Sequence, residues 1–179
     1  LSIWILFVLT LVVTAITSRH LDLGIYLMFI ELFSNPHGGL ISAPISGFTF
    51  SLRMAVFTGV MLGWVIGMAT KRYAINIRDH RLKLFALLAL AALWGMITGA
   101  LSQDIRQVFA DGNAYLYLLY LLPIVSVRWD EIKKHNLIQI LAAGGIWIAL
   151  VSLGLLYTFT HFGNNILTPA YSFFRDVRM

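Results

Sequence analysis

The chain has 179 residues, of which 59% are hydrophobic and 12% are charged, and it contains no cysteine. With a mean hydropathy of +0.82 it has too little polar surface to coat a water-soluble globule, so we predict an integral membrane protein. The absence of cysteine excludes disulfides and thiolate metal or redox chemistry. The net charge of +5 does not indicate nucleic acid, because the basic residues lie between apolar segments, where orientation in the bilayer explains them.

The first half of the chain predicts three membrane spans. Leu1–Thr17 and Leu52–Thr70 are long apolar runs, whereas Leu23–Phe33 is only about half to two-thirds as long as a normal span. This short segment carries Glu31, which must lie near an interface, face the bundle interior or pair with a cation, because a lone carboxylate facing lipid is costly. The prolines and glycines of Ser34–Ser51 forbid a continuous helix and predict an outer loop or re-entrant segment.

The second half predicts three more spans, at Leu84–Leu101, Asn113–Val127 and Leu137–Phe162. Pro123 is expected to kink the middle one. The six segments together predict an all-α, polytopic transmembrane helix bundle. Because the chain opens inside an apolar run without an initiator methionine, we expect residues 1–179 to be a single transmembrane region from a longer protein.

Small residues recur at every fourth position of the third and fourth predicted spans. Such a row leaves one face of a helix bare, so that another helix can approach it closely. We predict that these two rows pack against each other: Gly59, Gly63 and Gly67 on one side, and Ala91, Gly95 and Gly99 on the other.

The basic residues predict the orientation of the chain. Lys71–Lys83 holds five Lys or Arg residues and Arg128–Asn136 holds three, and short loops of this kind stay on the cytoplasmic side of a membrane. With Arg19, the predicted inner loops hold nine of the 13 basic residues. The predicted outer side holds the other four, which are Arg53, Arg106, Arg175 and Arg178.

These four outer arginines are the candidate substrate-binding residues. Topology disfavours basic residues on the outer side, whereas the planar guanidinium of arginine binds phosphate through two charge-assisted hydrogen bonds. One alternative is that Arg53 only extends to lipid headgroups. The other is that Arg106, Arg175 and Arg178 form weak surface ion pairs with nearby aspartates.

No catalytic residue and no metal or cofactor site is predicted from motifs. Nucleotide-binding, metalloprotease and serine-hydrolase signatures are missing from the sequence. The five histidines lack the spacing of metal ligands, so we expect them to be interfacial or capping residues: His20, His37, His80, His135 and His161.

Several stretches resemble the N-terminal half of the O-antigen ligase and polymerase-like family. They are the outer segment PHGGLISAPISGFTF leading into LRMAVFTGVMLGW, the segment FADGNAYLYLLYLLPIV and the outer FFRDVRM. The resemblance implies a bacterial inner-membrane glycosyltransferase that takes its glycan from an undecaprenyl-diphosphate carrier on the periplasmic side, without metal or nucleotide. It also implies that Arg53 contacts the diphosphate, that Arg175 and Arg178 belong to the outer arginine set, and that the catalytic histidine lies downstream of this chain.

Two other classes of function stay open at this point. In half of a secondary transporter or flippase, the interruption between Ser34 and Gly47 would be a broken helix at a substrate site. A scaffold subunit would have no chemistry at all. The charges lie at the ends of the predicted spans and the middles carry Gly, Ala and Thr, which favours the glycosyltransferase over the transporter.

Overall fold

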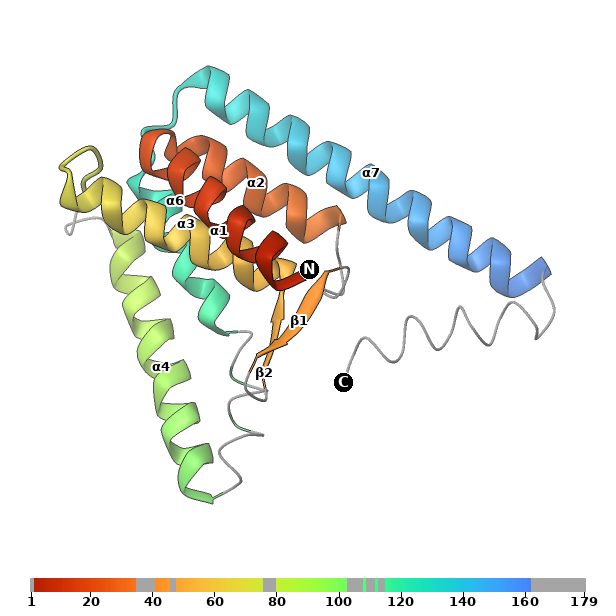
Figure 1. The fold of residues 1–179 in the computed structure, drawn as a ribbon, viewed down its shortest axis with the longest axis horizontal. Coiled ribbons are helices and arrows are strands. Elements are labelled where there is room, and N and C mark those ends of the chain that lie inside the picture. Colours follow the sequence, from red (N-terminus) through yellow and green to blue (C-terminus); the bar gives the residue numbers. More distant parts are fainter. Residues whose placement is uncertain are drawn as a thin grey trace.

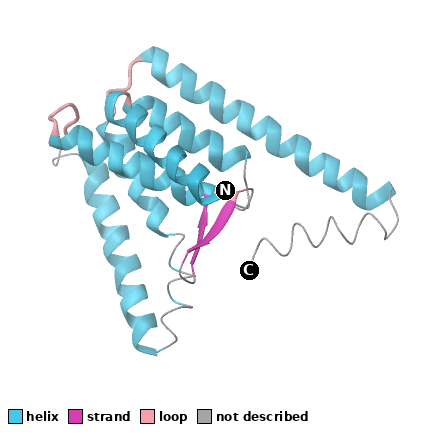
Figure 2. Cartoon of the chain, in the orientation of Figure 1, coloured by secondary structure: helices cyan, strands magenta, loops and turns pink. Residues whose placement is uncertain are grey.

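The computed structural model describes residues 2–34, 41–45, 48–75, 80–102, 108, 112 and 115–161. Over these residues the protein is an all-α bundle with one short β-hairpin (Figure 1, Figure 2). Four described helices are long and apolar enough to cross a membrane, namely α1 (Ser2–Arg19), α3 (Leu52–Ala69), α4 (His80–Ser102) and α7 (Glu131–His161). The shorter helices are α2 (Leu21–Ser34) and α6 (Leu121–Ser126), which follows the 3-10 turn η1 (Tyr117–Tyr120). Each of the six predicted segments therefore contains a helix.

Helices α1, α2 and α3 form the packed centre of the bundle (Figure 1). Val13 of α1, Ile25 of α2 and Val60 of α3 are buried together in its core. A second buried cluster, nearer the hairpin, contains Leu6 of α1 and Ala55 of α3, so both clusters involve these two helices. The close approach of α1 to α3 is possible because α3 presents glycines to it.

The predicted pairing of the two small-residue rows is wrong. Gly59 and Gly63 face α1, where an added Cβ would lie 2.8 Å from Val13 Cβ and 2.6 Å from Thr17 Cβ, respectively. A Cβ added at Gly95 would meet no described atom within 4 Å, and α4 diverges from the bundle (Figure 1). The spacing of small residues identifies a bare helix face, but it does not identify the helix that covers that face.

Large apolar side chains stay exposed along the outer helices. Leu90 and Trp94 of α4 are 64% and 69% exposed, and Ile146 and Leu153 of α7 are 61% and 62% exposed. A water-soluble domain does not display apolar faces of this size, whereas a membrane protein turns them towards lipid. The structure therefore supports the predicted membrane location.

The predicted inner loop Arg128–Asn136 is mostly helical, because α7 begins at Glu131 rather than at Leu137. Asp130 caps the helix: its Oδ1 accepts a hydrogen bond from the Lys133 backbone N–H at 2.8 Å. This hydrogen bond holds the pKa of the Asp130 carboxyl below its usual value. The polar residues after Asp130 are good helix formers, so hydropathy placed the boundary too late.

The expected break near Pro123 lies slightly earlier in the chain. The segment changes from a 3-10 turn to an α-helix between Tyr120 and Leu121, and Pro123 occupies the first turn of α6. Proline is tolerated there because the first amides of a helix have no acceptor within it. The irregularity therefore comes before the proline and not at it.

A β-hairpin occupies part of the predicted outer loop. β1 (Ser42–Ile45) pairs antiparallel with β2 (Phe48–Ser51), with Ser42 opposite Ser51. Over the described residues the segment contains no helix, as predicted, but no strand was expected there. β2 continues directly into α3, so the hairpin fixes the start of that helix (Figure 1).

The predicted inner connections gather at one end of the bundle. After α3, the hydroxyl of Tyr73 donates to the Thr17 carbonyl oxygen at 2.7 Å, and Arg72 Nη1 donates to the Ser18 carbonyl oxygen at 3.3 Å. The Tyr26 hydroxyl joins α2 to the first turn of α7 by donating to the Lys133 carbonyl oxygen at 2.9 Å. This arrangement agrees with the predicted topology, which puts all three connections on the same side.

Candidate functional site

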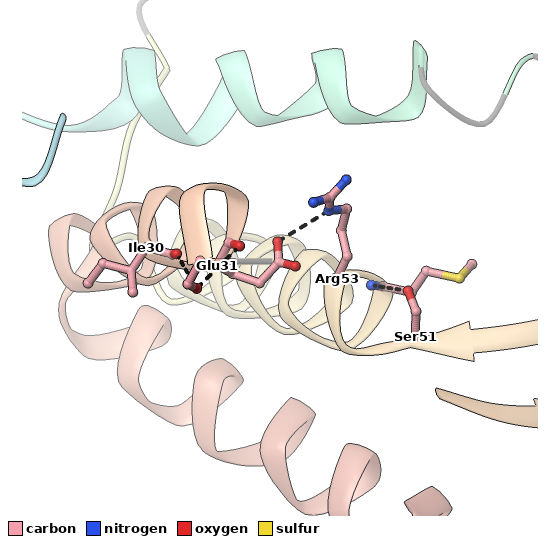
Figure 3. A network of polar contacts seen from close by, with 6 residues as sticks. Ile30, Glu31, Ser51 and Arg53 are labelled. Carbon is pink, nitrogen blue, oxygen red and sulfur yellow. Dashed lines mark hydrogen bonds and ion pairs between the residues drawn. The ribbon is translucent and has the colours of Figure 1, made fainter. Parts of the chain in front are cut away.

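The candidate site lies at the other end of the bundle, where the hairpin enters α3. Ser51 caps this helix with an extended backbone (φ −106°, ψ 166°), and its Oγ accepts a hydrogen bond from the Met54 N–H at 3.4 Å (Figure 3). Arg53, the second residue of α3, is therefore held by a strand on one side and by a capped helix on the other.

Arg53 forms an ion pair with Glu31 of α2. Its Nε donates to Glu31 Oε2 at 3.4 Å, and the two side chains are 21% and 8% exposed (Figure 3). A carboxylate buried to this extent requires a cation or hydrogen-bond donors. Of the three possibilities that the sequence left for Glu31, the structure shows two together, because Glu31 is buried in the bundle and pairs with a cation.

Both charges lie at helix ends where the helix dipole disfavours them. Arg53 is in the first turn of α3, whose N-terminus carries partial positive charge, and Glu31 is in the last turn of α2, whose C-terminus carries partial negative charge. Neither residue is therefore explained by the stability of its own helix. Their pairing offsets both unfavourable placements, and it keeps a guanidinium at this end of the bundle.

Aromatic residues form the neighbouring wall of the site. Phe57 of α3 makes edge-to-face contacts with Tyr117 and Tyr120, with ring centroids 5.3 Å and 5.0 Å apart. Because Phe57 follows Arg53 by about one helical turn, both tyrosines contact the face of α3 that carries Arg53. In the view of Figure 3 the guanidinium of Arg53 lies between Glu31 and the helical segment drawn above. Chemically, the site combines a partly buried guanidinium with nearby phenol groups, which is suited to an anion.

The structure describes only one of the four predicted substrate-binding arginines. Arg53 lies at the predicted mouth of α3, whereas Arg106, Arg175 and Arg178 lie outside the described residues. The reach of Arg53 to lipid headgroups is limited by its contact with Glu31. Its role in binding phosphate stays a prediction.

Two of the described histidines, His135 and His161, have local side-chain partners. His135 is 3.0 Å from Gln139 Nε2, and the ring of His161 stacks on that of Tyr157. Over the described ranges no three histidine, aspartate or glutamate side chains come together as a metal site would require. His37 falls outside these ranges.

Comparison with known proteins returned no matching family model, no matching curated protein and no matching solved structure. The geometry of the site is therefore the main basis for a functional proposal.

Sequence analysis identified Arg53 and singled out Glu31, but it did not join them, and it missed Phe57, Tyr117 and Tyr120 as neighbours. Phe57 could have been found, because it follows Arg53 by four positions and so lies on the same face of α3. The two tyrosines lie within the predicted span Asn113–Val127. Their contact with Phe57 depends on how η1 packs on α3, which no local pattern predicts.

Proposed function

We propose that this chain is part of a glycan ligase or polymerase of a bacterial inner membrane. The enzyme transfers a polysaccharide from an undecaprenyl-diphosphate carrier on the periplasmic side, and Arg53 binds the diphosphate. The observation that carries the proposal is the partly buried Arg53–Glu31 pair at the predicted outer end, with both charges placed against the helix dipoles. The sequence resemblance points to the same residue.

The chemistry of the transfer explains why an arginine is needed. The acceptor hydroxyl oxygen forms a bond to the anomeric carbon while the bond from that carbon to the phosphate oxygen breaks, and the electron pair leaves with the diphosphate. A guanidinium fixed beside that oxygen stabilises the charge that develops in the transition state. The proton of the hydroxyl passes to a base, which the resemblance assigns to a segment beyond Met179.

In this proposal Glu31 is a positioning residue. Its Oε2 accepts a hydrogen bond from Arg53 Nε at 3.4 Å and so holds the guanidinium at the start of α3 (Figure 3). Since an arginine side chain has many rotamers, one fixed contact lowers the entropic cost of holding the guanidinium in a binding geometry. Tyr117 and Tyr120 can add hydroxyl donors to the same anion.

Nothing in the described residues favours the transporter alternative in the same way. That alternative expects two half-helices at the proline and glycine interruption, whereas residues 42–45 and 48–51 form a hairpin.

The test is glycan transfer from the lipid carrier by the complete protein, purified and reconstituted in lipid. Arg53→Lys keeps the charge but loses the planar fork, and Arg53→Ala loses both. We expect transfer rates to fall by about ten- to a hundred-fold for Arg53→Ala, because a charge-assisted contact contributes about 1.5 to 3 kcal/mol. The matched control is Lys83→Ala, which removes an exposed cation at the predicted inner end of α4.

Normal membrane expression with a selective loss in the Arg53 variants supports the proposal. Wild-type transfer by Arg53→Ala at both saturating and limiting donor would remove Arg53 from the site. A loss of the same size in Lys83→Ala would point instead to a general effect of charge on the folded membrane protein.

A further inference from the structure

A second polar site lies at the predicted inner end of the bundle. It is a cavity of about 680 Å³ between the α1–α2 turn, the segment after α3 and the connection from α6 to α7. A volume of this size is typical of sites for small molecules and headgroups. The proposed function does not use this cavity, since it lies at the end opposite Arg53.

The charges that line the cavity are strongly unbalanced. Five cationic residues and one acidic residue line it, a formal balance of five minus one, or +4, with histidine neutral. One of the five cations, Lys133, also forms an ion pair with Asp130 at 3.5 Å. Orientation in the membrane explains why each connection is basic, but it does not require them to share one cavity. The charged lining residues are Arg19, Lys71, Arg72, Arg128 and Lys133, together with Asp22.

The backbone holds two of these cations in place. After α3, the Arg72 N–H donates to the Gly67 carbonyl oxygen at 2.8 Å, and the Lys71 N–H donates to the Met68 carbonyl oxygen at 2.9 Å. This pair of hydrogen bonds is a Schellman motif, which needs a left-handed residue at the position of Lys71. Lys71 has φ 59°, a conformation in which glycine is the usual residue.

The left-handed backbone conformation at this position therefore disfavours lysine. A glycine would satisfy the turn better, yet the chain has a cation there, and this residue lines the cavity. Arg72 is fixed by its hydrogen bond to the Ser18 carbonyl oxygen, and Tyr73 by its bond to the Thr17 carbonyl oxygen. Both residues line the same cavity, so its basic wall is preorganised.

We propose that this cavity binds a phosphate group, in the form of the phosphate of an anionic lipid in the cytoplasmic leaflet. Arginine and lysine side chains that converge on one point satisfy several phosphate oxygens at once. The cavity lies at the ends of α1 and α3, where lipid headgroups are found, and basic pockets between transmembrane helices on this side suit such headgroups. A free phosphate has the same chemistry, so the experiment must separate the two sources.

Binding is measured by calorimetric titration of the purified protein in zwitterionic detergent at fixed ionic strength. One arm uses short-chain phosphatidylglycerol and the other uses inorganic phosphate. The central variant is Lys71→Gly, which relieves the left-handed backbone and so should fold at least as well as the wild type. It should nevertheless bind phosphatidylglycerol about tenfold more weakly, since one charge-assisted contact is lost. Arg72→Gln keeps a donor for the Ser18 carbonyl oxygen and should weaken binding similarly.

The matched control is Lys134→Gln, which removes an exposed cation at the same end of the bundle but outside the cavity lining. Unchanged binding in the control and weakened lipid binding in Lys71→Gly support the proposal. If inorganic phosphate binds with the same dependence on Lys71 while the lipid does not bind, the site is a phosphate site and its lipid source is refuted. Equal losses in Lys71→Gly and Lys134→Gln, or no saturable binding of either probe, would overturn the proposal.

Discussion

Replacing Arg53 and Glu31 together separates the contribution of their ion pair to stability from the contribution of Arg53 to glycan transfer. At the observed 3.4 Å and an effective dielectric constant of about 20, the two charges attract each other by about 5 kcal/mol. Much of this attraction is offset by the desolvation of Glu31, whose side chain is only 8% exposed. We therefore expect Glu31→Leu alone to lower the free energy of unfolding by about 2 kcal/mol, less than for a fully buried pair, because Arg53 stays partly hydrated.

Replacing both partners with apolar residues of similar size should remove most of that loss. The variant Glu31→Leu with Arg53→Met is expected within about 1 kcal/mol of the wild type, since apolar replacements of buried ion pairs are often neutral or stabilising. Stability is measured by denaturant unfolding in lipid nanodiscs, and glycan transfer is measured on the same samples. Our reasoning predicts a stable but inactive protein. A double variant that transfers glycan at the wild-type rate would refute phosphate binding by Arg53, and one as unstable as Glu31→Leu alone would refute the pair energetics.

Three further predictions concern the fold. Gly63→Leu should lower the yield of folded protein and destabilise it by about 3 kcal/mol or more, because a Cβ at this position would lie 2.8 Å from the Thr14 carbonyl oxygen. Gly95→Leu should be tolerated, and equal tolerance of the two variants would contradict the α1–α3 contact. Thr17→Val should increase the free energy of unfolding by about 1 kcal/mol and so raise the melting temperature, since Thr17 Oγ1 is buried without a hydrogen-bond partner among the described residues. A lower melting temperature would indicate a bound water or another partner of this hydroxyl. Because the folded pKa of Asp130 is lowered, its capping stabilises α7 above the unfolded pKa and is lost as the pH falls through the folded value. Hydrogen-exchange protection factors at the start of α7, which correct the measured rates for the intrinsic dependence of exchange on pH, should therefore fall in acid, and they should fall less in Asp130→Asn.

Local patterns predicted the helices but not the contacts between them. Hydropathy located the six apolar segments, because a helix in lipid needs a nearly continuous apolar sequence. It placed the start of α7 too late, since the cap at Asp130 and the helical propensity of polar residues are invisible to hydropathy. The hairpin was missed because its two strands have only four residues each and contain Pro44, which is rare in strands.

For the candidate site, too, the sequence identified individual residues but not the contacts between them. The sequence identified Arg53 by its charge on the predicted outer side, and Glu31 by the cost of a carboxylate in a span. Their pairing joins α2 to α3 across 22 positions, and it depends on the antiparallel packing of those helices. The glycines of α3 indicated a close contact correctly, but the partner is α1, which precedes α3 by two helices.

The short length of α2 has a consequence for the surrounding lipid. With 14 residues α2 is about 21 Å long, whereas the hydrocarbon core of a bilayer is about 30 Å thick. If α2 begins at the inner boundary with its neighbours, its last turn ends well below the outer boundary, so the Arg53–Glu31 pair lies in a depression of the membrane surface. Lipids beside α2 must thin or tilt to follow that depression, which brings outer headgroups and water down to the pair. Bilayer thickness then becomes a variable of the site itself, because longer acyl chains deepen the depression that any ligand of Arg53 has to enter.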